Sequence, residues 1–287
     1  MTEQRNPMFR KVAIIGIGLI GGSMGMALRK NRLAQEVVGV SRQHASLVHA
    51  LKNGTVDKAS HDIKKSVENA DLIILATPVK TIIQLLPEIG KAAKRGCIII
   101  DVGSSKTKIV EAAEKNIPSH AFFVGCHPLA GSEKKGALFS KLDLFQNSWC
   151  LIASTDKTNK PALEKVKLLW EKLGANTKII SPEEHDKILS FTSHLPHLLA
   201  FGLMAAIPSS YLEYAAQGLR DTTRIASSDP EMWRDICFTN SKDILKSLDE
   251  FVKILAAIRK SIVADNEQNL TEQFKKSKEK RDAIERS

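Results

Sequence analysis

Short apolar runs alternate with helical patterns through the first part of this chain. The runs lie at residues 11–17, 37–40, 71–76, 97–101, 122–124 and 149–153. Strands that are apolar throughout and separated by helices indicate a parallel sheet with helices on both faces. Because crossovers between parallel strands are right-handed, the pattern predicts a doubly wound α/β fold.

The character of the sequence changes after Ser181-Pro182. Helical patterns follow over residues 183–206, 209–217, 232–239 and 242–265, and no convincing strand pattern is found there. A chain of 287 residues is long enough for two domains with their own cores. We therefore expect an α/β domain over residues 1–181 and an all-α domain over residues 182–287.

The net charge of +10 raises the question of a nucleic-acid partner. The basic residues near the C-terminus are interleaved with glutamate and aspartate, which is typical of an exposed helix end. Aromatic residues make up only 5% of the chain, and none cluster with the lysines as stacking platforms. We expect no nucleic-acid partner, and a positive field that favours anionic small molecules.

The spacing of the cysteines and the length of the apolar runs indicate whether the protein binds a metal, crosses a membrane or is secreted. The four cysteines lie far apart, without the spacing of a zinc site or a disulfide framework. The N-terminal residues do not form a signal peptide, and no uninterrupted apolar stretch approaches membrane-spanning length. We therefore expect a cytoplasmic protein with neither a bound metal nor a membrane partner.

The segment Gly16-Ile17-Gly18-Leu19-Ile20-Gly21 follows the first apolar run and opens a helical pattern, which is the context of a dinucleotide-binding motif. Gly16 would make the tight turn, Gly18 would let the backbone approach the pyrophosphate, and Gly21 would allow close packing of helix on strand. The free N–H groups at the helix start favour phosphate, so Leu19 and Ile20 are cofactor-binding candidates too. The motif predicts a Rossmann-type domain; a turn without a ligand is the alternative.

The second apolar run ends in Ser41-Arg42, without the aspartate or glutamate that NAD sites usually carry to accept from the ribose 2′-OH. Ser41 can hydrogen-bond a 2′-phosphate, and Arg42 can pair with it and stack on adenine. The pair favours NADP over NAD, the alternative being an ordinary surface arginine.

Further polar residues follow the later runs, at the sheet edge where ligands bind in such folds. Thr77-Pro78 would line the cofactor, Ser104 would face the ligand, and Ser105 would cap the next helix. His127 lies in a turn just past the fifth run. A histidine of near-neutral pKa can accept a proton from a hydroxyl as its carbon loses hydride. A structural histidine that anchors the turn is the alternative.

The helical part offers two more candidates. His194 and His197 flank Pro196, so one ring can point into a cleft while the other packs. Arg224 stands among small and apolar residues, which predicts a partly buried guanidinium that needs an anion. That anion is either Asp221 or a substrate carboxylate bound in bidentate fashion.

As a set, these segments resemble the prephenate/arogenate dehydrogenases of tyrosine biosynthesis. The matching segments are residues 16–22, 101–106, 125–133, 193–197 and 221–234, in the family's order and over nearly the whole chain. The resemblance implies oxidative decarboxylation of a cyclohexadienyl substrate, with hydride transfer to a nicotinamide cofactor and aromatisation of the ring. It also implies a homodimer formed by the helical domain.

The resemblance assigns roles to individual residues. His127 matches the catalytic histidine that bonds the ring hydroxyl, and Ser104 matches a serine that orients both. Arg224 matches the arginine that binds a substrate carboxylate, and His197 matches a histidine near the substrate side chain. The remaining substrate-binding candidates are Trp233, Ser132 and Glu133.

Two departures from the family pattern leave the substrate open. Many NAD-dependent members carry Asp at the position of Ser41, so Ser41-Arg42 is similar to NADP-using, arogenate-type members. His197 stands where some arogenate-type members have an apolar residue, and a cationic or donor histidine would suit the keto acid of prephenate. We rank prephenate ahead of arogenate and NADP ahead of NAD.

Two other functions are weighed against this one. A β-hydroxyacid dehydrogenase or imine reductase shares the plan of the two domains but typically uses a lysine on an interdomain helix. A non-catalytic NADP-binding regulator would need only the glycine loop.

Overall fold

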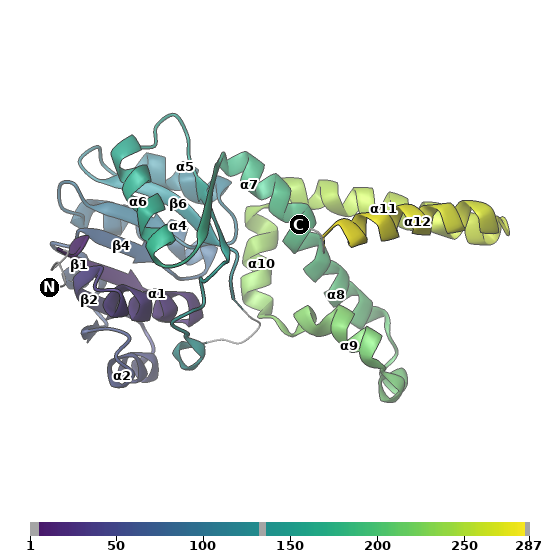
Figure 1. The fold of residues 1–287 in the computed structure, drawn as a ribbon, viewed down its shortest axis with the longest axis horizontal. Helices are drawn as coiled ribbons and strands as arrows, with labels where there is room; N and C mark the ends of the chain where they lie inside the picture. The colour runs from purple at the N-terminus through teal and green to yellow at the C-terminus, as the bar shows by residue number, and fades with distance from the viewer. Residues whose placement is uncertain (1–5, 132–135, 285–287) are drawn as a thin grey trace, which may run out of the picture. The chain divides into compact units, whose positions relative to one another are not determined.

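The computed structural model describes residues 6–131 and 136–284. They form two compact units, one up to Ser241 and one from Lys242 onward. In the first unit, eight strands form a sheet in the order β3-β2-β1-β4-β5-β6-β7-β8. Figure 1 labels β1, β2, β4 and β6 in this sheet. The strands are β1 (Phe9–Ile15), β2 (Ala34–Val40), β3 (Lys58–Ser60), β4 (Leu72–Leu75), β5 (Ile98–Asp101), β6 (Phe122–Pro128), β7 (Trp149–Ala153) and β8 (Asn176–Ile180).

This order confirms the doubly wound α/β prediction, with three differences. The sequence did not predict β3 and β8, because β3 has only three residues and β8 is mostly exposed, so neither forms an apolar run. β7 runs antiparallel to β6 and pairs His127 with Leu151, whereas we expected a parallel sheet. β6 also continues to Pro128, so His127 lies within a strand and not in the predicted turn.

Alternation along the central strands sends their side chains into two separate cores. In β1, Val12 and Ile14 pack on one face of the sheet with the helices at Leu19–Lys30 and Lys160–Lys172, whereas Ala13 and Ile15 pack on the other face with the helices at Val79–Ala92 and Thr107–Asn116. The helices around the sheet are α1 (Leu19–Lys30), α2 (His44–Lys52), α3 (Ile63–Val67), α4 (Val79–Ala92), α5 (Thr107–Asn116) and α6 (Lys160–Lys172).

The described chain beyond β8 is helical, as predicted. A continuous run joins α7 (Pro182–Leu189), a π-helical turn (Ser190–His194) and α8 (Leu195–Ala206). The run Pro182–Ala206 is long and apolar enough to cross a membrane by length and composition alone, a criterion that core helices of soluble proteins also meet. The first unit ends with 3₁₀ turns at Ser209–Tyr214 and Arg224–Ser227 and with helices α9 (Gln217–Thr223) and α10 (Pro230–Thr239).

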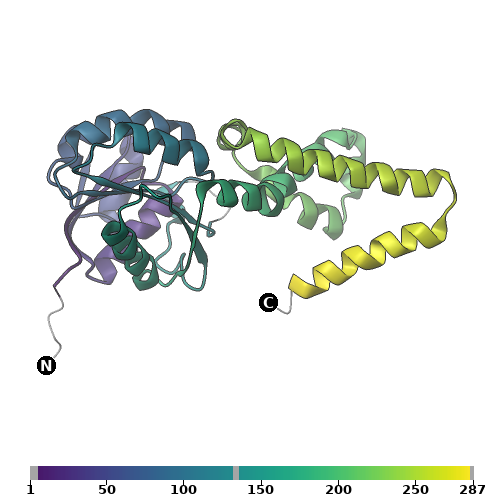
Figure 2. The same cartoon turned by 90° about the horizontal axis from the view of Figure 1, so that it is seen from above.

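The second unit is a pair of helices, α11 (Ser241–Val263) and α12 (Glu267–Ile284). Figure 2 shows them as two arms joined by a short turn. Near that turn, the Gln273 amide donates to Ser261 Oγ at 3.0 Å. α12 has no buried residue, and apolar side chains such as Phe274 are exposed on it. Its apolar side chains therefore find little cover within this chain.

Candidate active site

Two glycines close the turn between β1 and α1. Gly16 has φ +101°, and a Cβ there would lie 2.7 Å from the carbonyl carbon of Ala76 and nearer still to its oxygen. A Cβ on Gly21 would overlap the carbonyl oxygen of Gly16. By contrast, a Cβ on Gly18 would meet no atom within 4 Å. The backbone therefore leaves no room for a side chain at Gly16 or Gly21, whereas the space next to Gly18 is open.

A pocket of about 570 Å³ lies over this turn. Gly18, Leu19 and Ile20 line it at the start of α1, and Thr77 and Pro78 line it beyond β4. Thr77 Oγ1 is buried and has no hydrogen-bond partner among the described residues. Unpaired N–H groups at a helix start together with an unpaired buried hydroxyl fit a phosphate-bearing ligand. The residues present therefore fit a dinucleotide.

Basic and polar groups gather beyond the end of β2. Arg42 is exposed and lines the same pocket. Ser41 Oγ accepts from the backbone N–H of Gln43 at 3.1 Å, and the Ser41 carbonyl lies 2.8 Å from His61 Nδ1. His44 stacks on His61 with ring centroids 5.8 Å apart. An arginine, a hydroxyl and two imidazoles therefore surround this end of the strand.

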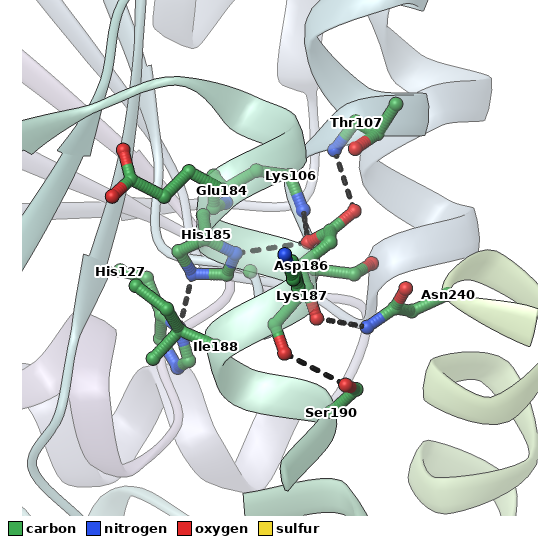
Figure 3. Close-up of polar contacts among 12 residues, drawn as sticks. Lys106, Thr107, His127, Glu184, His185, Asp186, Lys187, Ile188, Ser190 and Asn240 are labelled. Carbon is green, nitrogen blue, oxygen red and sulfur yellow. Dashed lines mark hydrogen bonds and ion pairs between the residues drawn. The ribbon is translucent and has the colours of Figure 1, made fainter. Parts of the chain in front are cut away.

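His127 lines the pocket from β6. Because it pairs with Leu151 of β7, both side chains project from one face of the sheet. Leu151 packs with Leu189 of α7 on that face, so α7 lies over His127. His185 of α7 thereby comes to His127, with Nε2 2.9 Å from Nδ1 of His127 (Figure 3).

The surroundings keep His127 neutral. Burial lowers its pKa well below the usual value, and His185, Lys106 and His194 lower that pKa further. Lys106 is itself fully buried, in an ion pair with Asp101 at the end of β5. A neutral imidazole has one nitrogen lone pair, so His127 can accept a hydrogen bond from a hydroxyl.

Asp186 joins α7 to the start of α5. One carboxylate oxygen lies 2.9 Å from His185 Nδ1 and accepts from the N–H of Lys106 at 2.7 Å, and the other accepts from the N–H of Thr107 at 2.9 Å (Figure 3). The Asn240 amide donates to the Asp186 carbonyl at 2.8 Å. The sequence placed His185 and Asp186 in a long helix and assigned them no role.

Two serines follow β5, Ser104 and Ser105, and the predicted role of Ser105 is wrong. We predicted that Ser105 caps α5, but its Oγ lies 2.8 Å from Thr239 Oγ1 of α10. The prediction was wrong because Asp186, distant in sequence, caps α5 in its place. Ser104 is half-buried and lines the pocket that His127 also lines.

The substrate candidates of the helical part form a second group. His197 stacks on Trp233 with ring centroids 3.8 Å apart, and His194 meets the edge of the same indole at 6.0 Å. Burial lowers the pKa of His197 by more than the hydrogen bond to the Ser193 carbonyl raises it, and the charge of Arg224 also lowers it. Among the described residues, the lining of the 570 Å³ pocket includes neither His197, Trp233 nor Arg224.

The predicted burial of Arg224 is wrong, because its side chain is exposed. Its neighbours Ile225 and Ala226 lie in a 3₁₀ turn and are only half-buried, so they form no apolar enclosure around the guanidinium. Asp221, its predicted alternative partner, accepts a hydrogen bond from the Gln217 amide at 2.7 Å.

Two further substrate candidates, Ser132 and Glu133, lie outside the described residues. Gly131 and Gly136, on either side of that gap, both line the pocket. In the described parts of the chain, no group of three His, Cys, Asp or Glu side chains is placed to hold a metal ion.

Two family descriptions match the chain. "Prephenate dehydrogenase, nucleotide-binding domain" matches residues 24–179, and "Prephenate dehydrogenase, dimerization domain" matches residues 181–276. The chain belongs to the prephenate dehydrogenase family. His127 falls in the first matched region of this family, whereas His185 and Asp186 fall in the second. The resemblance seen in the sequence is thereby confirmed.

Named relatives cover most of the chain. It is 37% identical to the prephenate dehydrogenase of Bacillus subtilis (strain 168), over 97% of this chain and 77% of that relative. It is 34% identical to the cyclohexadienyl dehydrogenase of Zymomonas mobilis, over 96% and 97%. A solved prephenate dehydrogenase from A. aeolicus, in complex with hydroxyphenyl propionate and NAD⁺, matches with a TM-score of 0.90 and 32% identity, over 96% of this chain and 98% of that one.

Proposed function

We propose that this chain catalyses the oxidative decarboxylation of prephenate to 4-hydroxyphenylpyruvate, with hydride transfer to a nicotinamide cofactor, in tyrosine biosynthesis. The observation that carries the proposal is that neutral His127 lines the same pocket as the start of α1. The NAD⁺ complex of the A. aeolicus relative supports the cofactor, and the names of the Bacillus and Zymomonas relatives support the substrate class.

The main contribution of the protein to this reaction is to position and polarise the substrate. A nicotinamide cofactor held at the start of α1 would supply the acceptor for the hydride that leaves the ring carbon bearing the hydroxyl. His127 accepts a hydrogen bond from that hydroxyl, which becomes more acidic as its carbon loses electrons. CO₂ leaves from the opposite ring carbon and the ring becomes aromatic. The proton stays with the phenol, so His127 ends the turnover neutral, as it began.

The other residues hold the two reactants. Gly16 and Gly21 shape the turn, while Gly18, Leu19 and Ile20 present backbone N–H groups to the pyrophosphate. We assign Thr77 and Pro78 to the cofactor side of the pocket. Ser104 orients the substrate hydroxyl and the His127 ring.

Arg224, His197 and Trp233 are assigned to the substrate's carboxylate and side chain. The Arg224 guanidinium can bind a carboxylate in bidentate fashion. The pair of stacked rings supports the assignment, because an imidazole held against an indole has a fixed direction for its nitrogen atoms. Ser132 and Glu133, outside the described residues, keep their proposed place near the substrate.

Arogenate is the second candidate substrate, and one observation favours it. The prephenate argument needs a donor at His197, yet His197 Nδ1 already lies 2.9 Å from the Ser193 carbonyl and donates there. Burial lowers the pKa of His197, so the ring is neutral near pH 7 and its Nε2 is an acceptor. An acceptor suits the ammonium group of arogenate; a protonated His197 would suit the keto acid of prephenate.

Cofactor preference is a separate proposal: NADP over NAD. Arg42 lines the pocket beside Ser41, and neither is a carboxylate that would repel a 2′-phosphate. The test is titration calorimetry with NADP⁺ and NAD⁺ on the native enzyme and on Arg42→Gln. We expect Arg42→Gln to weaken NADP⁺ binding at least ~10-fold, because a charge-assisted pair is lost, and to leave NAD⁺ binding unchanged. Equal losses for both cofactors would contradict the assignment.

Initial rates with prephenate and arogenate, each with NADP⁺ and NAD⁺, test the function itself. We expect turnover to be fastest with prephenate and NADP⁺, and His127→Asn to lower kcat by about 10²–10⁴-fold with cofactor binding intact. A preference for arogenate would keep the chemistry and support the acceptor at His197. Silence in all four assays, or full activity of His127→Asn, would refute the proposal.

We also propose a homodimer, built by a dimerisation and substrate domain over residues 182–287, in the cytoplasm and without a nucleic-acid or membrane partner. The dimerization-domain match and the exposed apolar side chains of α8, such as Leu203, support it. Sedimentation equilibrium tests it: we expect Leu203→Asp to weaken the dimer. Leu168→Asp, at a similarly exposed position of α6 in the sheet domain, is the matched control. A native monomer at micromolar concentration would refute the homodimer.

A further inference from the structure

A chain of two hydrogen bonds lies behind His127, and the proposed mechanism does not use it. It runs from His127 Nδ1 to His185 Nε2 over 2.9 Å, and from His185 Nδ1 to a carboxylate oxygen of Asp186 over 2.9 Å (Figure 3). The side chains of His185 and Asp186 are 0% and 2% exposed, so water does not compete for these bonds. Strand β6 and helix α7 are therefore joined through three polar side chains.

The direction of each bond follows from the carboxylate. Two backbone N–H groups and His185 donate to Asp186, and these contacts hold its pKa below the usual value despite its burial. An ionised carboxylate can only accept, so His185 Nδ1 carries the proton that lies between them. Burial lowers the pKa of His185 by more than its hydrogen bond to Asp186 raises it, and Lys106 also lowers it, so the ring is neutral and its Nε2 has a lone pair. His127 Nδ1 must then be the donor to that lone pair.

This direction decides what His127 can do. With its proton on Nδ1, the lone pair of the neutral ring is on Nε2, the nitrogen that His185 does not use. The other tautomer, with its proton on Nε2, could donate to a substrate hydroxyl but could not accept from it. Without a fixed partner at Nδ1, the ring is free to adopt either tautomer.

We propose that His185 is a positioning residue that holds His127 in the tautomer protonated at Nδ1, and that Asp186 holds His185 in turn. The inference rests on the proposed function for what the Nε2 lone pair does, but the tautomer itself can be measured without turnover. Other charged or titratable groups that face this chain are Lys106 and Asp101 from the sheet side and His194 from the π-helical turn.

The position of α7 makes the arrangement rigid. Asp186 caps α5 through two N–H groups, and Asn240 of the α10–α11 junction donates to its carbonyl at 2.8 Å. Leu151, Ile180 and Leu189 form a small apolar cluster that packs α7 on β7 and β8. His127, which accepts the hydrogen bond from the substrate, lies in the region that matches the nucleotide-binding domain. His185, which orients His127, lies in the region that matches the dimerization domain.

The test is long-range ¹H–¹⁵N NMR of the full-length protein with ¹⁵N-labelled histidine, without ligand, near neutral pH. The His127 signals are assigned by their absence in His127→Asn. We expect native His127 to carry its proton on Nδ1. In His185→Leu, which cannot accept, the ring should change to the Nε2-protonated form or to a mixture. In His185→Gln, whose amide oxygen can accept, the native tautomer should persist.

Kinetics provide the second measurement. We expect His185→Leu to lower kcat by about 10²-fold with KM for both substrates within about 3-fold, and to shift the acid limb of the kcat/KM pH profile. His185→Gln should recover most of the lost kcat. His120→Leu is the matched control, because it removes a histidine whose bond to the Ala93 carbonyl lies outside the site.

Several outcomes would overturn the inference. They are an Nε2-protonated His127 in the native enzyme, an unchanged tautomer in His185→Leu, and a His185→Leu kcat within about 3-fold of native. If His185→Leu does not fold, the native spectrum and His185→Gln still decide it. An enzyme that is inactive on both cyclohexadienyl substrates but shows the expected tautomers would refute the proposed function and leave the positioning inference standing.

Discussion

The turn between β1 and α1 holds one glycine for steric reasons and another for ligand access, and alanine substitutions separate the two. Gly16 has φ +101°, which an L-residue with a Cβ rarely adopts. Adopting it costs about 1–2 kcal/mol. The added Cβ would also overlap the Ala76 backbone, and displacing packed backbone costs a further ~1–3 kcal/mol. We therefore expect Gly16→Ala to lower the free energy of unfolding by about 3 kcal/mol.

Two other glycines are matched controls for the two parts of this cost. Gly96 has φ +80° but would place a Cβ within 4 Å of nothing, so Gly96→Ala should lose only the conformational part, ~1–2 kcal/mol. Gly18 has φ −97° and ψ −158°, which alanine adopts, and its Cβ would also meet nothing within 4 Å. Gly18→Ala should therefore be as stable as native or gain up to ~1 kcal/mol.

Affinity for NADP⁺ should separate the variants differently from stability: Gly18→Ala, the most stable of them, should bind NADP⁺ weakly. The methyl group of Gly18→Ala would project into the space where we place the pyrophosphate, so NADP⁺ affinity should fall at least ~10-fold. Gly96→Ala should bind NADP⁺ normally. Urea denaturation followed by circular dichroism measures the stabilities, and titration calorimetry measures the affinities. A Gly16→Ala protein no less stable than Gly96→Ala would refute the steric argument. Normal NADP⁺ binding by Gly18→Ala would refute the placement of the pyrophosphate next to Gly18.

Two further predictions concern buried charge. Burial lowers the pKa of His194 from its ordinary value of 6.5 to about 4. Between these two pH values, His194 is protonated in the unfolded chain but neutral in the folded chain. Stability should be full above the higher value and fall by up to ~3 kcal/mol as the pH approaches 4, and urea titrations of His194→Gln should show a flatter acid limb. Lys106→Met should cost about 3–5 kcal/mol in the same assay, because it leaves the fully buried Asp101 carboxylate without its cation. Lys253→Met, which removes an exposed ion pair with Glu250, should lose nothing measurable, and equal losses would contradict the argument.

The central strands could be predicted from the sequence because burial on both faces leaves a clear trace. β1, β4 and β5 are runs of apolar residues, and each was located to within two residues of its observed ends. β3 and β8 lie at the two edges of the sheet, where exposure removes the apolar run. The antiparallel direction of β7 has no local signature, since it depends on the path of the chain between β6 and β7.

The site was predictable where it depends on local geometry. A glycine turn before a helix and a polar residue at a strand end each define a position by themselves, and this placed His127, Ser104 and Thr77 on one pocket. The exposure of Arg224 could not be predicted from its neighbours in the sequence, because apolar residues in a short surface turn do not enclose the side chain beside them.

The partners of His127 were missed for a different reason. Asp186 lies in the middle of α7, past the first turn. Glu183 and Glu184 in that turn already supply the acidic residues that stabilise a helix through its macrodipole, so nothing in the local sequence assigns Asp186 a role. In the folded chain, its carboxylate is used by another helix and by His185. The sequence of α7 is the same whether or not these contacts form, so only tertiary packing reveals them. The tautomer of His127 therefore depends on how α7 packs on β7, and a change in that packing would alter the proton position without altering any residue of the pocket.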